Sequence, residues 1–317
     1  MITKKSKIFL AGHNGMVGSA ILREFKKKGY RKIITKNKRE LNLLNQKQVE
    51  TFIKKIKPHY VIIAAAKVGG ILANQKKKAD FIYENLMIQT NIIHSAHIAG
   101  VQNLIFLGSS CVYPKNSKQP IKEKYLLSGE LEKTNDAYAI AKIAGIKMCE
   151  SYNLQYKRNY RCLMPSNSFG PNDNYDLETS HFLPAMIRKV HEVKMKKKDS
   201  LIIWGNGKVK REMIYVEDVA NACIFFMKKK TKETVINIGT GKDYSINDYV
   251  KKIIKIIKPN QNIKIKYDFN KPNGTRQKLL DVSIAKKYGW KSHFKLEDSI
   301  SKTCLLYTSP SPRDGLL

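Results

Sequence analysis

KIFLAGHNGMVGSAILREF, residues 7–25, is the stretch that decides the fold. Its apolar start, residues 7–11, predicts a short buried strand, and residues 19–25 predict a helix. Between them Gly12, Gly15 and Gly18 allow a tight turn and a close approach of backbone to a pyrophosphate, while the helix N-terminus adds partial positive charge. The order strand, glycine turn, helix predicts the opening of a dinucleotide-binding fold, although the spacing is G-x-x-G-x-x-G and not the commoner G-x-G-x-x-G.

Further strands and helices alternate along the chain. Buried strands are predicted at 32–35, 60–66, 103–107 and 159–164, with a long helix at 80–99. This rhythm predicts an α/β protein of Rossmann type, a doubly wound parallel sheet with a smaller C-terminal α/β substrate lobe. We expect the dinucleotide-binding domain to comprise residues 1–170 with a return segment at about 211–240, and the smaller lobe to comprise 171–210 and 241–303.

The second strand is followed by basic residues. Lys36-Asn37-Lys38-Arg39 contains no acid to hold a ribose 2′-hydroxyl, and a basic residue at this point accommodates the 2′-phosphate of NADP. We therefore expect NADPH as cofactor, with Lys38 as its chief contact. The alternative is that these lysines belong to a lysine-rich surface. Gly69 and Gly70 follow the third strand, where a cofactor could lie over them.

Tyr138 and Lys142 stand four residues apart in a predicted helix, so the phenol and the ammonium share one face. Asn135 or Asp136 can serve as the N-cap of this helix. A nearby ammonium favours phenolate and moves a tyrosine pKa from ~10 toward the working range. Ser109 ends the strand 103–107 and can bond the phenol or a substrate oxygen. On its own, such a pair is more often a feature of an ordinary helix than a catalytic device.

The composition limits the remaining possibilities. Hydrophobic content of 42% with 27% charged residues is that of a globular protein, and no apolar run is long enough to span a membrane. Five cysteines without C-x-x-C spacing favour reduced thiols in the cytoplasm. His94 and His97 have no evident third partner, so no metal site is expected. The net charge of +33 raises the possibility of nucleic-acid binding, but the basic residues are scattered, so we expect no nucleic-acid partner.

Several longer motifs carry a family resemblance. They are Gly12–Ile21, Ala65–Ile71, Glu84–Gln89, Gly108–Pro114, Tyr138-x-x-x-Lys142, Ser180–Ala185 and Trp204-Gly-x-Gly207. In this order, from about Lys7 to Lys302, the chain resembles the extended short-chain dehydrogenase/reductase family, most closely its GDP-L-fucose synthase branch. The resemblance implies NADPH-dependent conversion of GDP-4-keto-6-deoxy-D-mannose to GDP-L-fucose, by 3,5-epimerisation and then 4-keto reduction. It also implies a homodimer formed through helices at roughly 80–99 and 136–153.

The resemblance assigns roles to individual residues. Cys111 is implied as the base and His181 as the acid of the epimerisation, Tyr138 as the proton donor to the reduced ketone, Lys142 as its partner and Ser109 as the group that orients the carbonyl. A thiol can act as a base where positive charge and dipoles lower its pKa from ~8.5. The implied cofactor contacts are Gly12, Asn14, Gly15, Met16, Val17, Gly18, Lys38, Leu107, Gly108, Ser109, Ser110, Lys142, Pro165, Ser166, Asn167, Ser168 and His181. The implied contacts to the nucleotide sugar are Lys189, Trp204, Arg211, Asn273 and Lys278.

Two positions depart from the family pattern. Asn14 stands where some relatives carry arginine toward the 2′-phosphate, and Asn273 replaces an expected aspartate. The rival readings are a nucleotide-sugar 4-epimerase or 4,6-dehydratase on the same fold, or a non-catalytic NADPH- or nucleic-acid-binding protein. Dehydratases of this class typically carry an Asp-Glu pair where Ser110-Cys111 stands here, and a simple 4-epimerase has no use for Cys111 and His181.

The end of the chain departs from the family more sharply. From Cys304 the sequence continues Cys-Leu-Leu-Tyr-Thr-Ser-Pro-Ser-Pro-Arg-Asp, and its possible codons match a sequencing-library adapter read in frame. We therefore expect residues 304–317 to be artefactual. Finding this peptide encoded at the genomic locus would contradict that expectation. The segment is excluded from the fold prediction.

Overall fold

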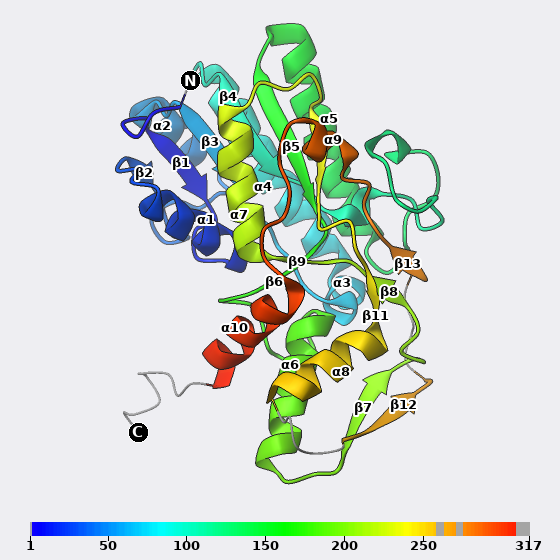
Figure 1. Ribbon diagram of the computed structural model, residues 1–317. Helices are drawn as coiled ribbons and strands as arrows, with labels where there is room; N and C mark the ends of the chain where they lie inside the picture. The colour runs from blue at the N-terminus through cyan, green and yellow to red at the C-terminus, as the bar shows by residue number, and fades with distance from the viewer. Residues whose placement is uncertain (1, 258–262, 271–274, 309–317) are drawn as a thin grey trace.

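A six-stranded parallel sheet forms the centre of the larger part of the molecule (Figure 1). The computed structural model describes residues 2–257, 263–270 and 275–308. The strand order is β10-β5-β4-β3-β1-β2, and every pair in it is parallel. This confirms the predicted α/β class and Rossmann-type sheet.

The central strands are short and apolar because helices cover both of their faces. All four residues of β1, β3 and β10 are buried, as are five of the seven in β5. The strands of the sheet are β1 (Ile8–Ala11), β2 (Ile33–Ile34), β3 (Tyr60–Ile63), β4 (Asn103–Leu107), β5 (Asn159–Pro165) and β10 (Val235–Ile238).

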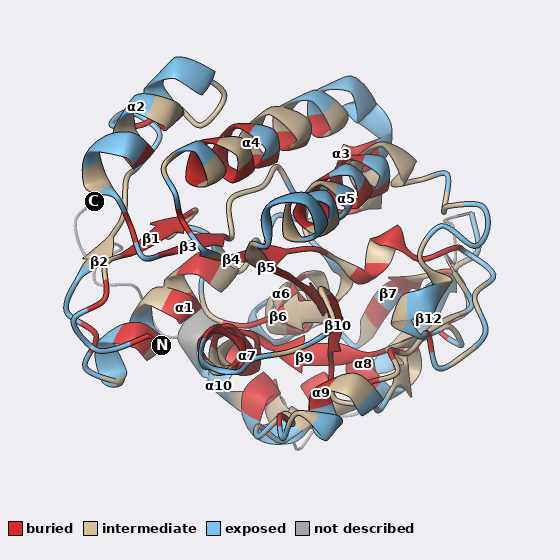
Figure 2. Cartoon of the chain, turned by 90° about the horizontal axis from the view of Figure 1, so that it is seen from above, coloured by how far each residue is buried: buried red, intermediate tan, exposed pale blue. Residues whose placement is uncertain are grey.

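Two helical layers enclose the sheet. Figure 2 shows α2 (Gln46–Ile56), α4 (Lys78–Ile98) and α5 (Asp136–Tyr156) over one face, with α1 (Met16–Lys27) and α7 (Val216–Lys228) beneath the other. Each layer has its own apolar core, one centred on α1 and α7 and one on α2, α4 and α5. The crossover through α7 returns the chain from the smaller part to strand β10 at the sheet's edge.

A third apolar core lies in the smaller part of the molecule. It is built from α6 (Phe182–Met195), α8 (Ile246–Ile257) and α10 (Leu296–Thr308). Short strands accompany these helices: β7 (Ser200–Trp204) with β12 (Lys264–Asp268), β8 (Lys210–Arg211) with β11 (Tyr244–Ser245) and β13 (Gln277–Lys278), and β6 (Asn167–Phe169) with β9 (Met213–Tyr215).

Part of the segment that the sequence assigned to the smaller lobe packs against the large sheet. The sequence assigned residues 241–303 to the smaller lobe, but Leu280 and Val282 pack into one core of the large sheet. Ala285 of α9 (Ser283–Lys287) and Trp290 pack into the other. Helix α10 extends to Thr308 and so includes the first residues of the segment expected to be artefactual, and Cys304 is buried in the third core.

Short connecting helices complete the chain. A helix α3 (Ile71–Lys76) follows β3, and two 3₁₀ turns, η1 (Ser110–Val112) and η2 (Glu123–Tyr125), follow β4. Because the sheet is parallel, the residues that follow β1, β3, β4 and β5 lie at one edge. This edge carries most of the residues that the sequence singled out.

Candidate active site

The glycine loop after β1 is shaped by two close backbone contacts. Gly12 has φ +87°, and a Cβ there would lie 2.5 Å from the backbone nitrogen of Ala65. A Cβ on Gly18 would lie 2.0 Å from the Gly12 carbonyl oxygen. These two glycines therefore let the loop, β3 and α1 pack together. At Gly15 the nearest atom to an added Cβ is 3.6 Å away, so this residue leaves the approach to the helix open.

The loop and its neighbours fit a dinucleotide. Gly15 is the N-cap of α1 with no side-chain hydrogen bond, and the first turn carries no acid, so its N–H groups and partial positive charge face outward. Two predicted contact segments also follow neighbouring strands: Leu107–Ser110 after β4 and Pro165–Ser168 at the end of β5 and beyond. The Ser166 hydroxyl is buried without a hydrogen-bond partner in the described chain, as is His13 Nδ1 in the glycine loop.

The basic run after β2 is only partly neutralised. Lys36 forms an ion pair with Glu40 at 2.7 Å, and Asn37 accepts hydrogen bonds from the backbone of residues 39 and 40. Lys38 is exposed and has no ion pair within the described residues. Asn14 is exposed in the glycine loop. Lys38 is thus available to an anionic group, and its contact with the cofactor phosphate stays a prediction.

Tyr138 and Lys142 lie where helix α5 packs most closely on the sheet. Gly145 allows that approach, since a Cβ there would lie 2.7 Å from the Phe106 ring of β4. Lys142 is buried and its Nζ donates to the Leu107 carbonyl at 2.8 Å. The same Nζ lies 5.9 Å from the centroid of the Tyr138 ring. The Ser109 hydroxyl is hydrogen-bonded to the Tyr138 side chain, so the three predicted residues do meet.

The protonation of this pair differs from the sequence expectation. Burial raises the pKa of the Tyr138 phenol, with the charge on Cys111 adding to the rise and the Ser109 hydrogen bond opposing it. Burial also lowers the pKa of Lys142 to about 7. The expected lowering of the tyrosine pKa is therefore wrong for this structure, because burial disfavours the charged phenolate. Tyr138 is held as a proton donor.

Cys111 lies beside the same group. Its backbone nitrogen donates to the Ser109 hydroxyl at 3.2 Å, which fixes the 3₁₀ turn that follows β4. Its Sγ accepts a hydrogen bond from Asn135 Nδ2 at 3.3 Å and lies 3.8 Å from Lys278 Nζ. Of the five cysteines only Cys111 is partly exposed, and the other four are buried. The sulfur is thus held by polar hydrogens at the catalytic edge of the sheet.

Two predicted nucleotide contacts, Lys278 and Arg211, interact with this sulfur. Strand pairing places Lys278 opposite Arg211, and the Arg211 guanidinium interacts electrostatically with Cys111. Its Nη1 donates to the carbonyls of Lys210 and Thr275. Burial lowers the pKa of Arg211, and Cys111 and Glu132 oppose that change. The sequence assigned both cations to the nucleotide, and that contact stays a prediction; in the structure Lys278 lies 3.8 Å from the sulfur and Arg211 is influenced by its charge.

His181 begins helix α6 as its N-cap, without a side-chain capping bond. His181 has solvent-exposed surface, but protein surrounds much of its imidazole. The resulting desolvation lowers the pKa of the ring. The ring makes no hydrogen bond with another described residue. The segment before it is fixed by the glycine pair after β3: Gly70 donates to the Thr179 carbonyl at 2.8 Å, and a Cβ on Gly70 would lie 2.4 Å from the Ser180 oxygen.

Lys189 and Trp204 form a separate pair. Lys189 of α6 donates to the Ile202 carbonyl at 3.1 Å, and its Nζ lies 5.8 Å from the Trp204 ring centroid. Burial lowers the pKa of Lys189. The structure therefore brings these two predicted contacts together in the smaller part of the molecule. Asn273 lies outside the described residues.

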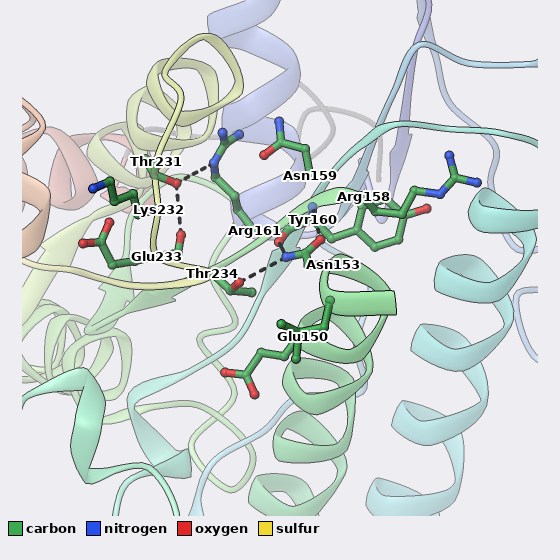
Figure 3. A pocket seen from close by; sticks show the side chains of 11 residues that line it. Glu150, Asn153, Arg158, Asn159, Tyr160, Arg161, Thr231, Lys232, Glu233 and Thr234 are labelled. Carbon is green, nitrogen blue, oxygen red and sulfur yellow. Dashed lines mark hydrogen bonds between the residues drawn. The ribbon is translucent and has the colours of Figure 1, made fainter. Parts of the chain in front are cut away.

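A polar hollow of about 340 Å³ lies at the opposite edge of the sheet (Figure 3). It is located where β5 and β10 begin. Its polar groups bond one another, since Arg161 Nε donates to Thr231 at 2.8 Å and Asn153 Nδ2 donates to Thr234 at 3.1 Å. These internal bonds indicate a structural joint between strands and helices, not a second catalytic site.

Sequence reasoning missed the part that Asn135 plays. It was predicted as a candidate N-cap of α5, and it does occupy that position, but its side chain makes no capping bond and reaches Cys111 instead. The spacing of Asn135 from Tyr138, one helical turn, is a signal that could have placed it near the site.

Fold and comparisons together define a Rossmann-type enzyme that uses a dinucleotide. The chain belongs to the NAD dependent epimerase/dehydratase family, which matches residues 8–239. The family match confirms that the chain is an enzyme.

Within this family the chain is similar to several GDP-L-fucose synthases. The chain is 46% identical to putative GDP-L-fucose synthase 2 of Arabidopsis thaliana over 303 residues, 96% of this chain and 92% of that protein. It is 45% identical to GDP-L-fucose synthase of Escherichia coli (strain K12) over 308 residues, covering 94% of this chain and 95% of that one. Among solved structures, MlghC, a GDP-mannoheptose C4 reductase from Campylobacter jejuni with NADP bound, has a TM-score of 0.88 at 36% identity, covering 98% and 100% of the two chains. The resemblance drawn from the motifs is confirmed.

Proposed function

We propose that this enzyme converts GDP-4-keto-6-deoxy-D-mannose to GDP-L-fucose, by inversion at C3 and C5 and then reduction at C4, with NADPH as the reductant. The observation that carries the proposal is the Cys111 thiol, hydrogen-bonded to Asn135 and close to Lys278, in the same group as Tyr138 and Ser109. A reductase without epimerisation needs the tyrosine and lysine alone. The names of the curated relatives support the same substrate.

NADPH would be held at the carboxyl edge of the sheet. The Gly12–Gly18 loop and the N-terminus of α1 would hold the pyrophosphate, Lys38 the 2′-phosphate, and the unpaired Ser166 hydroxyl would take up a hydrogen bond. The bound cofactor would supply the hydride for C4. The solved NADP complex of MlghC supports this choice of dinucleotide.

The epimerisation needs a base and an acid on opposite faces of the sugar. The 4-keto group acidifies the hydrogens at C3 and C5, and Cys111 as thiolate would remove one proton and become a neutral thiol. His181 would return a proton to the opposite face of the same carbon, and solvent would then restore both groups. Ser109 and Tyr138 would hydrogen-bond the carbonyl oxygen and stabilise the enolate that forms between the two transfers.

Tyr138 would give its proton to the C4 oxygen as the ketone is reduced. Its raised pKa keeps the phenol protonated until negative charge develops on that oxygen. Lys142 would fix the position of the phenol and bind the ribose of the cofactor. Lys189 and Trp204 would bind the GDP moiety, since an ammonium neutralises phosphate and an indole can stack on a base.

The test is an incubation of the purified enzyme with GDP-4-keto-6-deoxy-D-mannose and NADPH in D₂O. We expect loss of NADPH absorbance, GDP-L-fucose as product, and deuterium at both C3 and C5. Cys111→Ser should lose deuterium incorporation by at least about 100-fold, since removal of a general base typically costs 10²–10⁴, while NADPH affinity is unchanged. Reduction at C4 without exchange in the wild-type enzyme would mean a simple C4 reductase and would overturn the proposal.

We also propose that the enzyme is a cytoplasmic homodimer. Helices α4 and α5 pack against each other and leave large apolar side chains in solvent, with Tyr83 58% exposed and Leu154 76% exposed. Exposed apolar surface on neighbouring helices supports a contact between copies. No helix in the described ranges has the length and apolar character to cross a membrane. Light scattering should give twice the chain mass, and Leu154→Asp should lower it if this face is the contact.

A further inference from the structure

Asn135 occupies the N-cap position of α5 but does not use its side chain as a cap. Asparagine at this position normally accepts a hydrogen bond from the second or third N–H of the helix, and that bond stabilises the helix. Here the amide turns toward the 3₁₀ turn after β4, where Nδ2 donates to Cys111 Sγ at 3.3 Å. The helix start is supported instead by Asp136, whose Oδ1 accepts from the Ala137 backbone at 2.7 Å and pairs with Lys78 at 2.9 Å.

The other half of the Asn135 amide is also unused by the fold. Its Oδ1 is buried without a hydrogen-bond partner among the described residues. A buried acceptor left unpaired destabilises the folded state, so such an atom requires an explanation. Neither polar group of this side chain therefore contributes to the stability of the helix, and one of the two holds the reactive sulfur.

We propose that Asn135 is a positioning residue for the Cys111 thiol, whose amide hydrogen holds the sulfur as a hydrogen-bond acceptor and favours the thiolate. The inference rests on the proposed function, in which Cys111 is the base of the epimerisation. An N–H donor stabilises the charged form of its acceptor, and so increases the fraction of sulfur able to remove a proton.

Other charged groups interact electrostatically with the sulfur, but they hold its position less firmly than Asn135 does. Lys278 lies 3.8 Å away on a long, flexible stem, and Arg211 interacts with it while bonding two carbonyls. Tyr138 lies on the same helix as Asn135 and is affected by the sulfur's charge, and Glu132 lies near Arg211. The asparagine has only two side-chain torsions and begins a rigid helix, so it fixes the sulfur with little loss of entropy.

The first experiment measures the sulfur directly and requires no substrate. Iodoacetamide should modify Cys111 first because the other four cysteines are buried, and mass spectrometry of the Cys111 peptide gives its rate at each pH. In Asn135→Ala the pH midpoint of alkylation should rise, and the rate at neutral pH should fall about tenfold or more, as expected from the loss of one hydrogen bond to a charged acceptor. Asn135→Asp, which has the same shape but no donor and a negative charge, should shift the midpoint further up.

The matched control is Asp136→Ala, which removes the cap and the Lys78 ion pair one residue away. It should lower the melting temperature and leave the alkylation midpoint unchanged. Asn135→Ser restores a good N-cap, but its side chain cannot reach the sulfur. This variant should be as stable as the wild type and should still show a raised pH midpoint of alkylation. It therefore separates loss of the thiol contact from loss of folding.

The second experiment is deuterium exchange at C3 and C5, with NADPH affinity measured in parallel. Asn135→Ala and Asn135→Ser should lose exchange by about tenfold or more while the affinity for NADPH is retained. If both variants keep the wild-type midpoint and exchange rate, Asn135 has no part in positioning the sulfur and the inference is wrong. A wild-type enzyme that shows no exchange at all would refute the proposed function, whereas the alkylation series would still test the contact with Asn135.

Discussion

At the scale of single residues, the site is maintained at the expense of stability. Lys142 is 3% exposed, and its ammonium bonds one carbonyl oxygen and lies 4.6 Å from the Phe106 ring centroid. Burial lowers its pKa to about 7, which means that the folded protein disfavours the charged form that the unfolded chain carries. Tyr138 experiences the opposite change, since burial raises its pKa. Both shifts keep a proton on the phenol.

Lys142→Met should abolish reduction and stabilise the fold at neutral pH. Between pH 7 and about 10 the unfolded state binds a proton at this lysine that the folded state does not, so wild-type stability rises with pH across that window. The variant should therefore gain about 2–4 kcal/mol at pH 7, after subtraction of the lost hydrogen bond, and the gain should shrink toward pH 9.5. Urea unfolding at the two pH values measures it. A variant less stable than the wild type at both would contradict the burial argument.

At the scale of elements, short loops after the parallel strands set the geometry of catalysis. The glycine pair after β3, over which a cofactor could lie, also contacts a distant segment: Gly70 packs on the backbone of Thr179 and Ser180, directly before His181. Asn74 of α3 donates to the carbonyls of Gly69 and Gly70 and fixes the loop from the other side. The position of the proposed acid is thus set by a loop more than 100 residues away in sequence.

Gly70→Ala should displace His181 and slow the epimerisation. The added Cβ would lie 2.4 Å from the Ser180 oxygen, a backbone atom that cannot rotate away. We expect deuterium exchange at the substrate carbons to fall about 10- to 100-fold, since a misplacement near 1 Å can cost 10²-fold. NADPH affinity should change little.

The matched control for Gly70→Ala is Gly129→Ala. At Gly129 the nearest atom to an added Cβ is a proline carbon at 3.4 Å, an ordinary contact. This variant should retain wild-type exchange. Equal activity in the two alanine variants would show that the Gly70 contact does not position His181.

At the scale of the whole molecule, the dominant feature is charge. Fifty-nine lysines and arginines against 26 acids leave a formal net charge of +33. Much of the excess lies at the surface, and Lys4, Lys5, Lys26, Arg31 and Lys32 line one hollow near the N-terminal ends of the strands. Such repulsion disfavours the compact state and favours solubility.

The folded state should therefore become more stable as salt screens this repulsion. Raising NaCl from roughly 20 mM to about 0.5 M shortens the screening length from about 20 Å to a few ångströms, so we expect the melting temperature to rise by several degrees. Calorimetry measures the change. Sodium sulfate would mix screening with preferential exclusion, so the chloride series is the informative one. A melting temperature that falls with added chloride would mean that ion pairs outweigh the net repulsion.

Local sequence patterns determined the fold class and most of the residues of the candidate site. The glycine spacing, the apolar strands and the Tyr138–Lys142 pair each follow from neighbours within a few residues, where steric and helical geometry allow few alternatives. The helix expected at 80–99 is found at Lys78–Ile98, and the strand expected at 159–164 at Asn159–Pro165. Burial, by contrast, depends on the whole fold, and so the direction of the Tyr138 pKa shift was predicted wrongly.

Only the tertiary structure decided which distant residues meet. The pairing of β8 with β13 places Arg211 opposite Lys278, whose ammonium lies 3.8 Å from the Cys111 sulfur, and the charge on that sulfur also influences Arg211, although 167 and 100 residues separate the two cations from Cys111 in sequence. The contact of Asn135 is likewise decided by the tertiary structure. Its residue type and position predicted a helix cap, but its side chain bonds the Cys111 sulfur. Sequence encodes such contacts through the packing of entire layers, because a side chain's partners are fixed only when sheet and helices close around one core.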